Sequence, residues 1–196
     1  IGCTHNHLRR AVVLLKFEDA GTCILASKTE NIIYISTTER IDALSIITHH
    51  TYCTARLGEL PYNTALYIVG ILKFIDKYVL SELEITPLDT CVAVHVTCST
   101  RQMGVADTIV RVAKACAKNV LVPEEIGCCA FAGDKGFTEP ELNEWALRKL
   151  RPQVEKAGAT MGVSNSRTCE IGLSTHSGID YCSIAHLVNI TSKRKS

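Results

Sequence analysis

The sequence has little charge imbalance and no apolar run long enough to span a membrane. Its 196 residues carry 21 Lys and Arg against 20 Asp and Glu, so charge gives no reason to expect nucleic acid or a strongly anionic surface as a partner. The longest apolar stretch, TALYIVGILKFI, contains Lys73 and is followed by Asp76. A spanning helix needs about 18 to 20 apolar residues. We therefore expect no transmembrane segment, and no secretory signal is visible.

Patterns for covalent or acid–base catalysis are also lacking. No nucleophile–base arrangement and no pair of carboxylates stands out, and AGDKG is too short and wrongly placed for a dinucleotide-binding fingerprint. Asp134 and Lys135 in that segment are interpreted as a loop salt bridge rather than a catalytic pair. No catalytic residue is assigned. Because the chain begins with Ile1 and not Met, we expect a processed or trimmed product.

Cysteine, in contrast, is abundant, with ten residues in the chain. In a short, loop-rich secreted protein this number would indicate disulfides, but here long apolar helices and strands alternate. We therefore expect an intracellular reducing compartment, the cytoplasm or the mitochondrial matrix, with some thiols used as metal ligands. A position at the periphery of a membrane complex is compatible with this. Cys91, Cys116 and Cys182 lie on apolar faces and are expected in the core.

The apolar periodicity predicts alternating helices and strands, hence an α/β fold with mostly parallel pairing. Asn63 is an expected N-cap, and Pro152 should kink or restart the last long helix. Helices are expected over 8–21, 63–83, 103–119 and 138–158, and strands over 31–36, 43–48, 91–97 and 120–123.

Four cysteines of the second half occupy comparable places along this pattern. Cys98 closes a predicted strand, Cys128 and Cys129 follow the next strand, and Cys169 lies in the polar stretch SNSRTCEIG. In α/β sheets, binding sites form at the carboxyl ends of the strands. These thiols are therefore expected at one edge of a sheet.

The first half repeats this order in a shortened form. Cys3 precedes a predicted helix, a single Cys23 follows that helix, and Cys53 lies in HHTYCTAR. Cys53 is either a further ligand or a remnant, and Cys3 with Cys23 would make only a poorer second site. We interpret the pattern as two pseudo-repeated units. The expected organisation is a degenerate first cysteine-rich repeat (1–60), a connecting helix (61–89), a second repeat (90–190) and a solvated basic tail (191–196).

Three segments of the second half carry a family resemblance. HVTCSTRQMG, VPEEIGCCAFAGDKGFTEPELNEWAL and SNSRTCEIGLSTHSGIDYCSIAHLV resemble the C-terminal cysteine-rich region of iron–sulfur, FAD-linked D-lactate dehydrogenases. That region belongs to a wider group of paired cysteine-rich (CCG) domains, which also occur in heterodisulfide reductase and glycolate oxidase iron–sulfur subunits. The resemblance extends from about Thr90 to Val188 and is weak before residue 60.

The resemblance implies electron transfer. A flavin in a separate domain would oxidise a 2-hydroxy acid, and iron–sulfur centres would carry the electrons onward. The implied ligands of a 4Fe–4S cluster are Cys98, Cys128, Cys129 and Cys169. No FAD is expected within this chain, because it shows no flavin-binding domain. Because it also lacks a Cys-X-X-Cys-X-X-Cys ferredoxin run, we do not expect it to be the lactate-oxidising enzyme on its own. The implied partner is a flavin-containing dehydrogenase subunit or domain, or a larger protein complex.

Two positions depart from the family pattern. The wider group usually has Gly after the cysteine pair, where this chain has Ala130, and often ends in Cys-X-X-Cys, where this chain has Gly172. Tetrahedral zinc would suit the same four thiolates, and a strained vicinal disulfide is a competing possibility. A lost cluster would leave a non-catalytic accessory or structural subunit of a larger assembly, such as a mitochondrial or respiratory complex.

Other residues close to the cysteines also have expected roles. Gly127, Gly133 and Gly136 would let the backbone turn sharply around the pair. His95 would either orient a ligand or belong to the core. Arg167 would either neutralise cluster charge or pair with a nearby acidic residue, Glu170 or Asp180.

Overall fold

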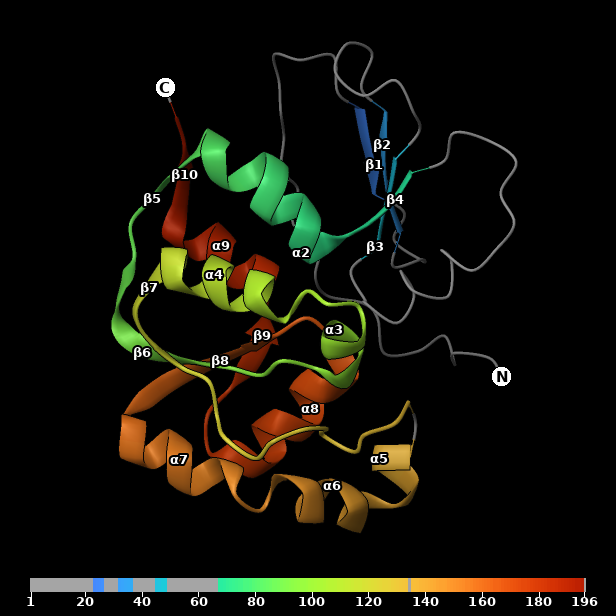
Figure 1. Cartoon of the computed structure of the whole chain (residues 1–196), viewed down its shortest axis with the longest axis vertical. Helices are drawn as coiled ribbons and strands as arrows, with labels where there is room; N and C mark the ends of the chain where they lie inside the picture. The colour runs from blue at the N-terminus through green and yellow to red at the C-terminus, as the bar shows by residue number, and fades with distance from the viewer. Residues whose placement is uncertain (1–22, 27–31, 37–44, 49–66, 134, 196) are drawn as a thin grey trace.

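The computed structural model describes residues 23–26, 32–36, 45–48, 67–133 and 135–195 (Figure 1). Its central feature is a four-stranded sheet with the order β7-β6-β8-β9. All three pairings in this sheet are parallel, so the expected α/β class is confirmed. The strands are β6 (Leu88–Val94), β7 (Ala117–Leu121), β8 (Ala159–Ser164) and β9 (Tyr181–Ser183).

Helices cover both faces of this sheet (Figure 1). Along β6 the side chains alternate, as strand geometry requires. Val92 and Val94 pack into one apolar cluster, and Ala93 packs into another on the opposite face. The first face is covered by α2 (Ile71–Phe74), α4 (Ala106–Cys116) and α9 (Ile184–Thr191). The second face is covered by α6 (Pro140–Leu147), α7 (Leu150–Ala157) and α8 (Arg167–Ser177).

The chain reverses its direction of winding between β6 and β8. From β6 it crosses to β7 on one side, and it then returns past β6 to build β8 and β9 on the other side. The loops that leave β6 and β8 therefore diverge at the carboxyl edge of the sheet. Such a switch point is where open α/β sheets place their binding sites.

The helix expected over 63–83 begins later than predicted. Residues Tyr67–Gly70 form β4, which pairs in parallel with β3 (Ser45–Thr48). An aromatic followed by β-branched residues is compatible with a strand, and the pairing with β3 outweighs the helical spacing. Helical structure follows as α2 (Ile71–Phe74), a π-helical turn η1 (Ile75–Val79) and a 3-10 turn η2 (Leu80–Glu82).

Two further boundaries show how local residues set the ends of elements. Helix α4 ends at Cys116, and β7 begins at once with Ala117, before the expected start at Val120. The helix expected over 138–158 is divided into α6 and α7, and Pro152 lies in the first turn of α7, as a restart requires. Gly158 closes α7 with φ of 62°.

The expected first repeat is described only in part. Strands β1 (Cys23–Ala26) and β2 (Ile32–Ser36) pair antiparallel, and β2 pairs antiparallel with β3. Of the predicted strands, 31–36 and 43–48 correspond to β2 and β3. The predicted helix over 8–21, the Asn63 cap, Cys3 and Cys53 lie outside the described residues, so the duplication stays a prediction.

The basic tail was expected to be solvated, but in the structure it pairs with another strand. Strand β10 (Ser192–Arg194) pairs antiparallel with β5 (Leu83–Ile85), and Lys195 Nζ donates to the Ser81 carbonyl at 2.6 Å. The tail is thereby attached to the end of the α2–η2 segment. No helix in the described part of the chain is long and apolar enough to cross a lipid bilayer.

Candidate metal centre

Two of the four predicted ligands lie at helix starts. Cys98 is the first residue of α3 (Cys98–Gln102), and the Thr97 hydroxyl caps this helix by accepting from the Thr100 N–H at 3.1 Å. The prediction that Cys98 closes a strand is wrong, because β6 ends at Val94. Cys169 lies in the first turn of α8 rather than in a loop. Both positions follow the carboxyl ends of parallel strands.

The cysteine pair lies in the loop after β7, where the backbone bends repeatedly. Three residues after the pair have positive φ, namely Ala130 (55°), Ala132 (45°) and Gly133 (78°). L-residues with a side chain rarely adopt this left-handed region, which glycine enters at no steric cost. The position after the pair thus has the conformation for which the wider group's Gly is suited, although this chain has Ala.

The four thiols form a series of neighbours, of which one pair is in direct contact. Cys129 Sγ lies 2.9 Å from Cys169 Sγ, and Cys128 affects the pKa values of both Cys98 and Cys129. Cys98 and Cys128 are exposed, whereas the exposed fractions of Cys129 and Cys169 are only 2% and 7%. The structure therefore brings the four predicted ligands together, with one end of the series at the surface and the other in the core.

These contacts and burial raise the pKa values of the thiols. Burial, followed by the neighbouring Cys128, raises the pKa of Cys98. The hydrogen bond to Cys129, followed by burial, raises the pKa of Cys128. For Cys129 the largest effect, the hydrogen bond with Cys128, lowers the pKa, but the contact with Cys169 and burial outweigh it and raise the value to about 12. Neutral thiols are poor nucleophiles, and a metal would have to displace their protons.

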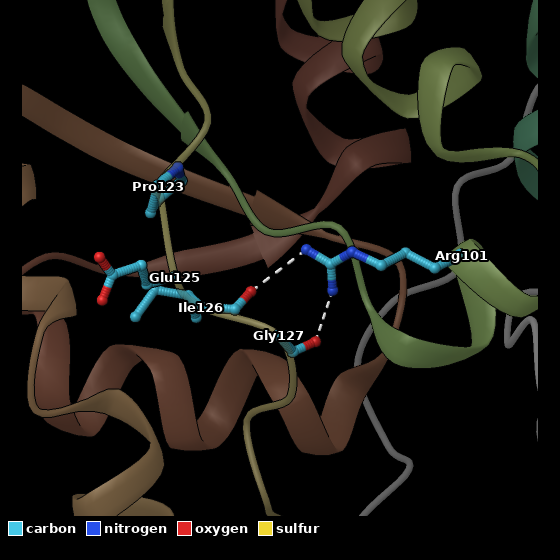
Figure 2. Close-up of a pocket in the computed structure, with 5 residues that line it drawn as sticks. All are labelled: Arg101, Pro123, Glu125, Ile126 and Gly127. Carbon is cyan, nitrogen blue, oxygen red and sulfur yellow. Dashed lines mark hydrogen bonds between the residues drawn. The ribbon is translucent and has the colours of Figure 1, made fainter.

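Arg101 binds the backbone immediately before the cysteine pair. It lies in α3, one turn after Cys98, and its guanidinium donates to the carbonyl oxygens of Gly127 at 2.5 Å and Ile126 at 3.2 Å (Figure 2). The same side chain lines an open pocket of about 310 Å³ together with Pro123, Glu125, Ile126 and Gly127. Arg101 thus links the helix of the first ligand to the loop of the next two.

Asn143 of α6 holds the other side of the pair. Its side-chain amide donates to the carbonyl of Cys129, and its own exposed fraction is 3%. A Cβ at Gly172 would lie 2.5 Å from Asn143 Nδ2 and 2.9 Å from the Phe131 ring. The second cysteine of a Cys-X-X-Cys ending therefore has no space here, because Asn143 and Phe131 fill its place.

Backbone N–H groups also point at the thiol sulfurs. The Ala130 N–H donates to Cys128 Sγ at 3.3 Å, and the backbone of Phe131 acts to lower the pKa of Cys129. Phe131 is itself buried and packs edge-to-face on Phe137, with ring centroids 4.9 Å apart. Such N–H donors stabilise thiolates and tune the properties of a bound metal.

The structure decides between the two readings of Arg167 and locates His95. Arg167 Nη1 lies 3.2 Å from the carboxylate of buried Glu170, so it pairs with that residue.

His95 is 1% exposed, and its Nε2 has no hydrogen-bond partner among the described residues. Burial, and then the charge of Arg101, lower the pKa of His95 to about 4. It is a neutral core residue here.

The remaining predicted residues lie away from the thiol series or outside the description. Lys135 Nζ pairs with Glu139 at 2.8 Å, while Asp134 lies outside the described residues. Cys116 is fully buried in the core, and half-buried Cys91 and Cys182 pack against the apolar clusters.

Arg101 and Asn143 were missed by the sequence reasoning. Asn143 could have been noticed as a polar residue on the buried side of α6, one turn before Leu147. Arg101 gave no such signal, because a basic side chain in a short polar helix is ordinarily solvated.

The donor set suits a metal–thiolate centre in its chemistry but not in its spacing. Four thiols are the ligands of structural zinc and of iron–sulfur clusters. Two thiolates on one tetrahedral zinc, with Zn–S bonds of about 2.3 Å, would lie roughly 3.8 Å apart, more than the 2.9 Å between Cys129 and Cys169. Within the described residues, no three His, Cys, Asp or Glu side chains form a group that could hold a metal ion. Binding would require these thiols to separate.

Comparisons with known proteins assign this chain to no family. No protein-family model matches the chain, and no curated protein matches it significantly. Function has to be inferred from the thiols and from the side chains that hold them.

Proposed function

We propose that this chain is an iron–sulfur electron-transfer module, related to the cysteine-rich part of FAD-linked D-lactate (2-hydroxy-acid) dehydrogenases and without a flavin domain in this sequence. The observation that carries the proposal is the convergence of the thiols of Cys98, Cys128, Cys129 and Cys169 at the carboxyl edge of one parallel sheet. A 4Fe–4S cluster held there would supply electron transfer.

The four cysteines would occupy different parts of such a site. Buried Cys129 and Cys169 would anchor it in the core, while exposed Cys98 and Cys128 would form its outer side. Electrons would then enter or leave through the outer side. The partner on that side would be a flavin-containing dehydrogenase subunit or domain in a reducing compartment.

Binding of a cluster would require the four thiols to move slightly apart. The loop after β7 is the segment suited to move, because it contains the positive-φ residues and connects the strand to α5 (Lys135–Thr138) without regular structure of its own. Arg101 and Asn143 fix the two sides of the pair. They would limit the opening to the cysteine pair itself.

Anaerobic reconstitution with iron and sulfide tests this proposal. The wild-type chain is expected to become brown, and Ser substitution at any of the four predicted ligands should reduce the visible absorption and the bound iron. Cys116→Ala is the matched control, because Cys116 is buried on the other face of the sheet. A chain that stays colourless, or ligand variants that bind as much iron as the control, would overturn the proposal.

A non-catalytic accessory subunit without a cluster is the second candidate. The 2.9 Å contact between Cys129 and Cys169, and the lack of a metal-holding group in the part of the chain that the structure describes, favour it. It predicts that the double variant Cys128→Ser/Cys129→Ser still assembles with the native partner and that the complex keeps its activity. Zinc bound in stoichiometric amount would instead indicate a zinc-stabilised binding domain.

A further inference from the structure

The innermost two thiols are much closer to each other than metal ligands are. Cys129 Sγ and Cys169 Sγ lie 2.9 Å apart, and a disulfide bond is about 2.05 Å long. An approach of about 1 Å would therefore bring the sulfur atoms to bonding distance. The two residues come from different segments, the loop after β7 and the first turn of α8.

Their surroundings hold the two sulfur atoms in this arrangement. Both residues belong to the apolar cluster between the sheet and α6–α8, together with Phe131, Leu147 and Leu173. The carbonyl of Cys129 is held by Asn143. Neither side chain can turn into solvent without breaking this packing, so the contact is built into the fold.

We propose that Cys129 and Cys169 are a redox-active dithiol, which a peroxide converts to a disulfide when the site carries no metal. The peroxide reaches the pair when the loop after β7 opens. The sulfur of one cysteine, once it has given up its proton, takes an oxygen from the peroxide, giving a sulfenic acid, and the proton joins the departing hydroxide as one water. The sulfur of the other cysteine then displaces hydroxide from that sulfenic acid, forming the S–S bond and a second water. The two sulfur atoms lose two electrons in total, and the O–O bond of the peroxide takes them up.

The disulfide would exclude a four-thiolate centre. It uses two of the four donors and joins the loop after β7 to α8, while Cys98 and Cys128 keep free thiols at the surface. The inference does not rest on the proposed function, because it concerns the metal-free chain. Failure of iron binding leaves it intact, and absence of the disulfide leaves iron binding open.

Peptide mapping of the full, chelator-treated chain after exposure to hydrogen peroxide tests the inference. Trypsin digestion yields three peptides that contain the relevant cysteines. Peptide 119–135 contains the cysteine pair, peptide 168–193 contains Cys169 and Cys182, and peptide 78–101 contains Cys91 and Cys98. The expected cross-link joins 119–135 to 168–193. It should persist in Cys128→Ser and Cys182→Ser and disappear in Cys129→Ser and Cys169→Ser.

Fragmentation of the wild-type cross-linked peptide assigns the two sulfur atoms directly, so the test does not depend on the folding of any variant. A link from 119–135 to 78–101 instead, a bond between Cys128 and Cys129, or thiols that all stay free or oxidise without linking would each overturn the inference. A cross-link through Cys129 and Cys169 in most of the molecules supports it.

Discussion

The side-chain amide of Asn143 donates a hydrogen bond to the backbone carbonyl of Cys129, so helix α6 fixes the peptide that follows the cysteine pair. The same amide occupies the space next to Gly172 of α8. One buried side chain therefore both holds the cysteine pair and fills part of the space that a side chain at position 172 would need.

Removal of this amide should destabilise the protein. Asn143→Ala leaves a buried carbonyl without its donor, which costs about 1–3 kcal/mol of the free energy of unfolding. Urea denaturation measures the change, with Glu144→Ala, an exposed neighbour on the same helix, as the control. Equal stability of the two variants would show that the hydrogen bond does not hold the loop.

Glycine at position 130 should stabilise the loop. Ala130 has φ of 55°, where a residue with a Cβ is strained by about 1–2 kcal/mol. Part of the relief is offset by the greater chain entropy of glycine in the unfolded state, so Ala130→Gly should raise the free energy of unfolding by up to about 1 kcal/mol. Ala115→Gly in the regular helix α4 should have the opposite sign. The same loss of stability in both variants would contradict the left-handed conformation.

Introduction of a Cys-X-X-Cys ending in α8 should not create a further metal ligand. The Cβ of Gly172→Cys would lie 2.5 Å from the Asn143 amide, and overpacking of this kind costs about 1–3 kcal/mol. The variant should unfold at lower urea concentration and should bind no more iron than the wild type. Gly127→Ala, whose Cβ meets no atom within 4 Å, controls for the added volume. A stable variant with increased iron content would show that the space is available.

Acid should destabilise the protein through His95. Burial, and then Arg101, lower the pKa of this imidazole from 6.5 to about 4. Its stabilising contribution is present above pH 6.5 and declines as the pH falls, because the unfolded chain takes up a proton that the folded one excludes. The loss is complete below about pH 4 and amounts to about 3 kcal/mol. His95→Phe should flatten this part of the profile, with exposed His186→Gln as the control. An unchanged slope in His95→Phe would assign the acid sensitivity elsewhere.

The sequence predicted the sheet edge better than it predicted the local structure there. Valine-rich β6 and the alternation of elements led to a parallel sheet, and strand ends in such sheets converge, so Cys98, Cys128, Cys129 and Cys169 could be grouped in advance. The position of Cys98 at a helix start depends on the Thr97 hydroxyl, which caps that helix. Many threonines in a sequence could act as caps, so this one could not be singled out in advance.

Residues that act through distant contacts could not be predicted in this way. Arg101 reaches carbonyls 25 and 26 residues away, and Asn143 reaches one 14 residues away. The start of the helix after Gly70 depends on pairing of β4 with β3, and periodicity alone does not report such pairing. These misses thus come from tertiary contacts that override a local pattern.

The metal and sulfide content of chain isolated under strictly anaerobic conditions tests the central claim most directly. Iron and acid-labile sulfide in equal amounts, close to four of each per chain for a 4Fe–4S cluster, is the predicted result, and both should be lost in Cys129→Ser. Protein that contains neither iron nor sulfide, and takes up neither on reconstitution, would contradict the proposal that these four thiols carry a cluster.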